Sequence, residues 1–178
     1  MRTVISTMTA GSREHEAVAR APILVLGLGN LLLTDDGAGL HLVRELASSF
    51  GGEARVEFVD GGTLGLSLLG VAEGRQAILI LDAVGLGAAP GSVHVLDEEQ
   101  ICEFRARRAA TAHEGNALAL LEALTLLGSA PHRMMVVGIE PEEIRTGDTL
   151  SPVVEAALNS AMAAAGSILQ RWLDSTLG

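Results

Sequence analysis

The chain switches repeatedly between short, continuous apolar runs and longer stretches in which apolar residues recur with helical spacing. The apolar runs cover residues 23–26, 77–81 and 134–139, and each is about as long as one strand; residues 55–59 are predicted to form a further strand. The stretches between them carry stripes typical of amphipathic helices, as over residues 36–50. This alternation predicts a mainly parallel sheet with helices on both of its faces.

One further strand is expected to run against the others. Residues 92–96 alternate apolar and polar positions, and a Gly/Pro-rich loop too short for a helical crossover connects them to the preceding strand. They are therefore predicted to pair antiparallel at the edge of the sheet. Helices are also expected at three further places: residues 64–71, from Thr111 or Ala112, and from Ser151-Pro152 with the serine as N-cap.

These elements together predict an α/β fold, a single-domain three-layer sandwich around a twisted sheet of about five strands. Residues 1–20 are polar, lack an apolar run of signal-peptide type and are expected to form a loosely held N-terminal extension. Residues 21–178 are expected to form the α/β domain. Hydrophobic residues make up 48% of the chain and aromatic residues only 2%, so the core must be aliphatic.

Composition also restricts the kinds of binding partner and the cellular compartment to be expected. The formal net charge of -10 argues against nucleic acid or an anionic membrane as the main partner. No apolar run reaches the roughly 18 residues that span a bilayer. Cys102 is the only cysteine, so the chain cannot form an intramolecular disulfide, which fits a reducing compartment. We therefore expect a cytoplasmic protein.

Three side chains of metal-ligand type are expected to meet at one edge of the sheet. Asp36 follows the first strand, Asp82 ends the third, and His113 lies at the start of the helix before the last strand. Ligands bind beyond the carboxyl ends of parallel strands, and the helices that return from those strands begin on the same side. Two carboxylates and an imidazole suit a divalent transition metal better than calcium or magnesium. The sequence thus predicts an open metal site.

Each of these residues also has a simpler interpretation. Taken singly, Asp36 fits a helix cap made together with Thr34 and Asp35, Asp82 fits an Asx turn, and His113 fits a locally hydrogen-bonded histidine. Only their shared position favours a joint site. The GLGN segment at residues 27–30 suggests a dinucleotide-binding loop, but Leu32 stands where that motif needs its third glycine.

Several segments, in this order and spacing, carry a family resemblance. They are LGLGNLLLTDDGAGLHLV, DGGTLGLSLLG, ILILDAV, AHEGNAL, VVGIEPEEI and LSPVVEAAL. Together they resemble the nickel–iron hydrogenase maturation endopeptidases, and the likeness covers about residues 22–172. The resemblance implies an endopeptidase that removes the C-terminal peptide of the hydrogenase large-subunit precursor after nickel has been inserted.

The resemblance also implies roles for individual residues. Asp36, Asp82 and His113 are expected to bind nickel and to carry the catalysis, with the nickel supplied by the substrate. Whether nickel is a recognition handle or a Lewis acid stays open, and so does the choice between an aspartic-type and a metallo-type mechanism. The segment of Asp60, Gly61, Gly62 and Thr63 is linked to substrate recognition.

Two other functions remain as alternatives. One is a non-proteolytic nucleotide-binding or phosphorylase-like α/β enzyme that uses the GLGN loop. The other is a metal-carrying maturation chaperone, which would keep the three ligands and cleave nothing. Cleavage of a nickel-loaded precursor, but not of a nickel-free one, separates the endopeptidase from both.

Overall fold

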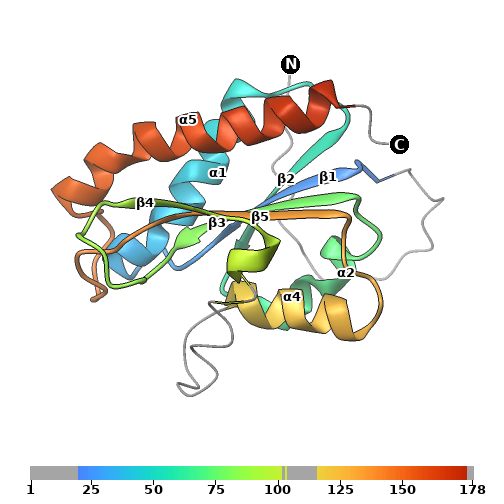
Figure 1. Ribbon diagram of the computed structural model, residues 1–178. Coiled ribbons are helices and arrows are strands. Elements are labelled where there is room, and N and C mark those ends of the chain that lie inside the picture. The colour runs from blue at the N-terminus through green and yellow to red at the C-terminus, as the bar shows by residue number, and fades with distance from the viewer. Residues whose placement is uncertain (1–19, 102, 104–115, 176–178) are drawn as a thin grey trace.

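The computed structural model describes residues 20–101, 103 and 116–175 of the chain (Figure 1). They form one five-stranded sheet with the strand order β2-β1-β3-β5-β4. Neighbouring strands are parallel except for β4, which pairs antiparallel with β5 at the edge. The predicted fold class, including the antiparallel edge strand, is therefore confirmed. The strands are β1 (Ile23–Leu28), β2 (Val56–Gly62), β3 (Ala77–Ala83), β4 (Val93–Leu96) and β5 (Arg133–Ile139).

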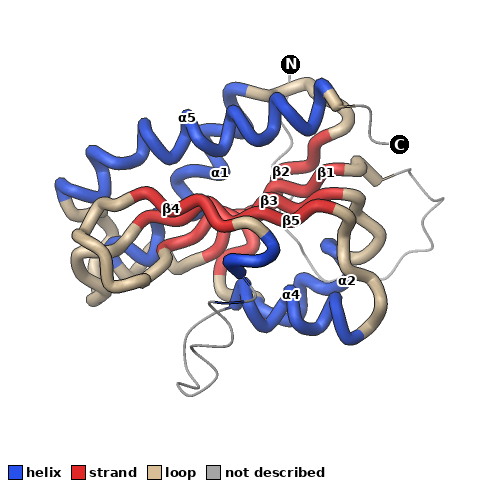
Figure 2. Tube along the Cα trace, viewed as in Figure 1, coloured by secondary structure: helices blue, strands red, loops and turns tan. Residues whose placement is uncertain are grey.

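Helices cover both faces of the sheet, which makes three layers (Figure 2). Helices α1 (Ala38–Ser49) and α5 (Pro152–Asp174) lie on one face, and α2 (Leu69–Ala72) and α4 (Asn116–Leu126) lie on the other. Each pair closes its own apolar cluster against the sheet. Strands β1 and β3 contribute to both clusters and are almost wholly buried, as expected of central parallel strands.

The C-terminal helix α5 is long and apolar enough, by length and composition alone, to cross a membrane. In the fold its apolar stripe packs on the sheet and on α1, so the helix has the pattern of a core helix. The stripe predicted from helical spacing is buried throughout: Val154, Leu158, Ala161, Ala165, Ile168 and Trp172.

Two predicted boundaries were wrong. The first long helix begins at Ala38 rather than Asp36, because the short 3-10 turn η1 (Thr34–Gly37) precedes it. Strand β2 continues to Gly62, where a turn over residues 60–63 was predicted. The pairing register shifts there between β1 and β2, which is a bulge-like irregularity, and Gly61 fits among the core side chains of Leu26, Leu28 and Leu68.

Two predictions fall on parts of the chain that the structure leaves undescribed. The N-terminal extension of residues 1–20 lies outside the described residues except for Arg20. The predicted start of a helix at Thr111 or Ala112 also lies outside them, whereas the described part of that helix is α4. A second short 3-10 turn, η2 (Gly65–Leu68), leads into α2 in the region predicted to be helical.

Candidate active site

The turn η1 and the end of β3 bring Asp36 and Asp82 to the same rim of the sheet. Gly39, in the first turn of α1, makes this approach possible, because a Cβ there would overlap the carbonyl oxygens of Leu28 and Leu81. Gly29 has φ +122°, and a Cβ at this position would overlap the carbonyl oxygen of Asp36. The two glycines therefore let the backbone around Asp36 pack directly on the strand ends.

The electrostatics of the rim show that the two carboxylates act on each other. Burial raises the pKa of Asp82, and the nearby charge of Asp36 raises it further, to about 7. A hydrogen bond of 2.9 Å from the Ala83 N–H to Asp82 Oδ1 opposes this rise but does not cancel it. The Asp82 carboxyl group therefore changes its protonation state near neutral pH.

The predicted third ligand, His113, lies outside the described residues. It precedes the start of α4 at Asn116 by three positions in the sequence. Asp82 alternates with Ile78 and Ile80 along β3, so the three residues share one face of the sheet. Both isoleucines belong to the apolar cluster on the α4 face. Within residues 20–101, 103 and 116–175, no group of three His, Cys, Asp or Glu residues is placed to hold a metal ion.

Asp60 lies near the end of β2, where an ion pair holds its carboxylate. Arg44 of α1 donates to Asp60 Oδ2 at 2.9 Å, and both side chains are partly exposed. The neighbouring glycines have different environments, since Gly61 is buried in the core while Gly62 is half-buried with φ +48°. Thr63 follows the strand in an exposed turn. Their proposed role in substrate recognition stays a prediction.

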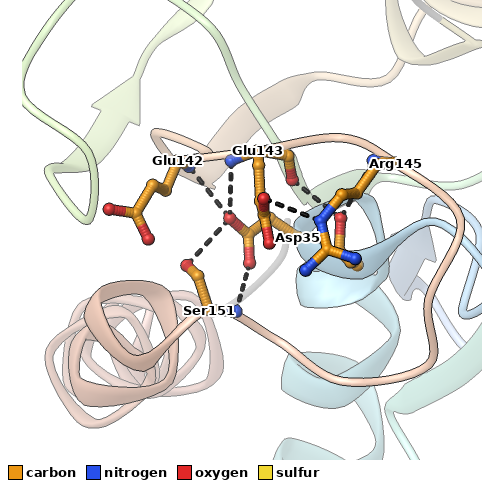
Figure 3. A network of polar contacts seen from close by, with 6 residues as sticks. Asp35, Glu142, Glu143, Arg145 and Ser151 are labelled. Atoms are coloured by element: carbon orange, nitrogen blue, oxygen red, sulfur yellow. Dashed lines mark hydrogen bonds and ion pairs between the residues drawn. The ribbon is translucent and has the colours of Figure 1, made fainter.

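Asp35 is a functional candidate of another kind, which the sequence interpretation treated only as a capping residue. Its side chain is fully buried and accepts four hydrogen bonds (Figure 3). Oδ2 accepts from the Glu142 N–H at 2.9 Å, the Glu143 N–H at 3.0 Å and the Ser151 hydroxyl at 2.9 Å. Oδ1 accepts from the Ser151 N–H at 2.7 Å. The Asp35 carboxylate thus ties η1 to the loop before α5 and to the start of that helix.

This bonding also explains two local features. Burial alone would raise the pKa of Asp35, but the hydrogen bonds from Ser151, Glu143 and Glu142 outweigh burial and lower it. Ser151 is the N-cap of α5, as predicted, and Pro152 follows it. Its hydroxyl makes no capping hydrogen bond to the helix and donates to Asp35.

A second buried carboxylate, Glu140, fixes the loop that follows Asp82. It accepts hydrogen bonds from the N–H groups of Leu86 and Gly87 at 2.8 and 3.0 Å, and it contacts His94 Nε2 at 3.0 Å. Burial opposes its ionisation, but these hydrogen bonds together lower the pKa of Glu140. This pair could not be predicted from sequence patterns, because His94 lies in β4 and Glu140 follows β5, 46 positions later in the chain.

Comparison with known proteins resolves the family. The model of a family described as "HycI: Hydrogenase maturation protease" matches residues 40–168, which is more than half of the chain. The chain belongs to the hydrogenase maturation protease family. Among curated relatives, the hydrogenase 2 maturation protease of Escherichia coli is 36% identical over 141 residues, covering 79% of this chain and 85% of that protein.

Other relatives agree with this assignment. The hydrogenase expression/formation protein HupD of Rhodobacter capsulatus is 32% identical over 151 residues, which cover 84% of this chain and 72% of HupD. The solved structure of the hydrogenase maturating endopeptidase HybD from Escherichia coli has a TM-score of 0.73 at 32% identity, covering 84% of this chain and 92% of HybD. This chain is accordingly a peptidase of hydrogenase maturation, and its fold is that of the solved maturation proteases.

Proposed function

We propose that this chain removes the C-terminal peptide of the nickel–iron hydrogenase large-subunit precursor once nickel has been inserted. Membership of the maturation protease family supports a peptidase that acts on a hydrogenase precursor. The observation that carries the finer proposal is the pairing of Asp36 and Asp82 at the sheet rim, where burial and the charge of Asp36 raise the pKa of Asp82 to about 7. Two carboxylates that repel each other are stabilised by a shared divalent cation.

In this proposal Asp36, Asp82 and His113 bind the nickel that the precursor already carries. The donor set fits such a transient encounter, because two hard carboxylates and no thiolate give only modest affinity for nickel. Bound nickel supplies positive charge that can polarise a peptide carbonyl or acidify a water molecule. The protein's own contribution is to orient the two carboxylates, and Asp82 is able to hold or release a proton near neutral pH.

Substrate choice is assigned to the neighbouring segment of β2. Asp60, Gly61 and Gly62 end the strand that pairs with β1, and Thr63 follows them; β1 leads into the loop that carries Asp36. Asp60 is partly exposed, so its carboxylate is accessible to a partner that competes with Arg44. The reaction is placed in the cytoplasm, in keeping with the single cysteine of the chain.

The test compares nickel-loaded with nickel-free large-subunit precursor. Incubation with the protein, followed by mass spectrometry of the large subunit, is expected to show loss of the C-terminal peptide only from the loaded form. Asp82→Asn and His113→Ala are expected to abolish this loss while circular dichroism stays unchanged. Glu57→Gln, at the opposite end of the sheet, serves as the control that keeps activity.

The other outcomes identify the alternatives. Stable binding of the loaded precursor without cleavage indicates a metal-carrying chaperone. Cleavage of casein or of short peptides in nickel buffer indicates an ordinary metalloprotease. Equal processing of loaded and nickel-free precursor refutes recognition through nickel.

A further inference from the structure

Asp35 and Asp36 are adjacent in η1 but have different environments. The Asp35 side chain has no exposed surface, whereas Asp36 is half-buried and its charge acts on Asp82. Figure 3 shows the Asp35 carboxylate between Ser151 and the backbone of Glu142 and Glu143. Asp36 therefore belongs to the sheet rim with Asp82, whereas Asp35 anchors the turn to residues 142–151.

The anchoring extends to the residue before Asp35. The Thr34 hydroxyl donates to the carbonyl oxygen of Glu143 at 2.8 Å and accepts from the Arg145 N–H at 3.1 Å. The Thr34 N–H donates to the carbonyl oxygen of Gly147 at 2.9 Å. Thr34 also has φ +42°, a conformation that side chains other than glycine rarely adopt and that persists only when surrounding contacts impose it.

A 3-10 turn of four residues has little rigidity of its own, because its hydrogen bonds are few and poorly aligned. The position of Asp36 is therefore set from both sides of the turn. Gly29 and Gly39 allow it to pack closely against the strands, and the hydrogen bonds of Thr34 and Asp35 hold it against residues 142–151.

We infer that Asp35 is a positioning residue of the peptidase, one that holds Asp36 at its working distance from Asp82 by fastening η1 to the loop before α5. The inference rests on the proposed function, since it assigns a role within that active site. The four side-chain hydrogen bonds of Asp35 go to residues 142–151 and none goes to Asp82, so Asp35 acts through Asp36. Residues that orient ligands in this way affect activity by about 10- to 100-fold when they are replaced.

Asp35→Asn is the informative variant. It preserves the side-chain volume but sets an NH₂ group against N–H and O–H donors, because both carboxylate oxygens accept hydrogen bonds. The matched control is Arg75→Lys. Arg75 is a buried residue at the opposite end of the sheet, where it donates to the carbonyl oxygens of Val71 and Ala21 and to Glu57.

The experiment measures kcat and KM on nickel-loaded precursor at a temperature where circular dichroism shows every variant fully folded. Both variants are expected to lower Tm. Asp35→Asn is expected to reduce kcat by about 10- to 100-fold, and Arg75→Lys to leave it unchanged. Equal kcat for Asp35→Asn and wild type, or an equal loss in Arg75→Lys, overturns the inference because the role of Asp35 is then only structural.

A second variant covers the case in which Asp35→Asn does not fold. Ser151→Ala removes one of the four hydrogen bonds and leaves the backbone donors in place. It is expected to reduce kcat several-fold, and an unchanged kcat overturns the inference. If wild type and Arg75→Lys both leave the precursor uncut, the proposed function fails instead, which is a distinct result.

Discussion

Replacing Asp82 by asparagine, a neutral side chain of the same shape, is predicted to stabilise the fold and to abolish peptidase activity. The folded-state pKa of Asp82 is about 7, against an ordinary value of 3.8. A raised pKa means that the folded state holds the proton more tightly than the unfolded chain. The resulting stability is fully present below pH 3.8 and is lost as the pH rises through about 7. Ionised Asp82 therefore destabilises the metal-free fold, by on the order of 4 kcal/mol above that pH.

Asp82→Asn removes the destabilisation that the ionised Asp82 carboxylate causes. Its amide oxygen can still accept the hydrogen bond from the Ala83 N–H, so the local backbone keeps its partner. Urea unfolding of both proteins in chelator is the assay. The variant is expected to be more stable, and its advantage in the free energy of unfolding is expected to grow by about 2–3 kcal/mol between about pH 5 and pH 8. An advantage that does not change with pH, or a more stable wild type at about pH 8, refutes the argument.

Three further predictions follow from other contacts. Glu140→Gln is expected to show the opposite pH trend in a urea titration extended below pH 4.5, because the lowered pKa of Glu140 contributes stability above its ordinary pKa of 4.5 and loses it as the pH falls through the folded value. Gly39→Ala is expected to destabilise the protein by about 1–3 kcal/mol and to reduce precursor processing, since the new methyl group displaces α1 from the strand ends. Urea unfolding measures the loss of stability, and a processing assay measures the loss of activity. Asp60→Asn is expected to change stability by less than about 1 kcal/mol, because its pair with Arg44 is partly exposed, yet to relax selectivity when two different large subunits compete for processing.

The architecture was predictable because apolar periodicity is a local signal. The buried runs of β1 and β3 and the stripe of α5 are legible in the sequence alone, and the short loop before β4 decides its antiparallel direction. The convergence of Asp36 and Asp82 followed from topology, since parallel strands end at one rim. His113 belongs to the same prediction and lies outside the described residues.

Other features depend on contacts between distant residues, which periodicity does not encode. Asp35 and Asp36 are chemically identical neighbours, and only the fold assigns one to the loop before α5 and the other to the rim. Glu140 meets His94 across two neighbouring strand ends. The extension of β2 through Gly61 needs the side chains of Leu26, Leu28 and Leu68 around it, so a glycine pair that is typical of a turn became part of a strand.

The hydrogen bonds of Asp35 also bear on when the enzyme matures during its own synthesis. They join the turn before α1 to Ser151, a partner 116 positions later in the chain. A ribosome translates from the N-terminus, so the strand and turn that carry Asp36 leave it long before α5 does. Two of the four hydrogen bonds to the Asp35 carboxylate come from Ser151, so they cannot form until the start of α5 has been made. In a nascent chain that still lacks α5, the turn that carries Asp36 is consequently held by only part of the contacts that fix it in the complete fold.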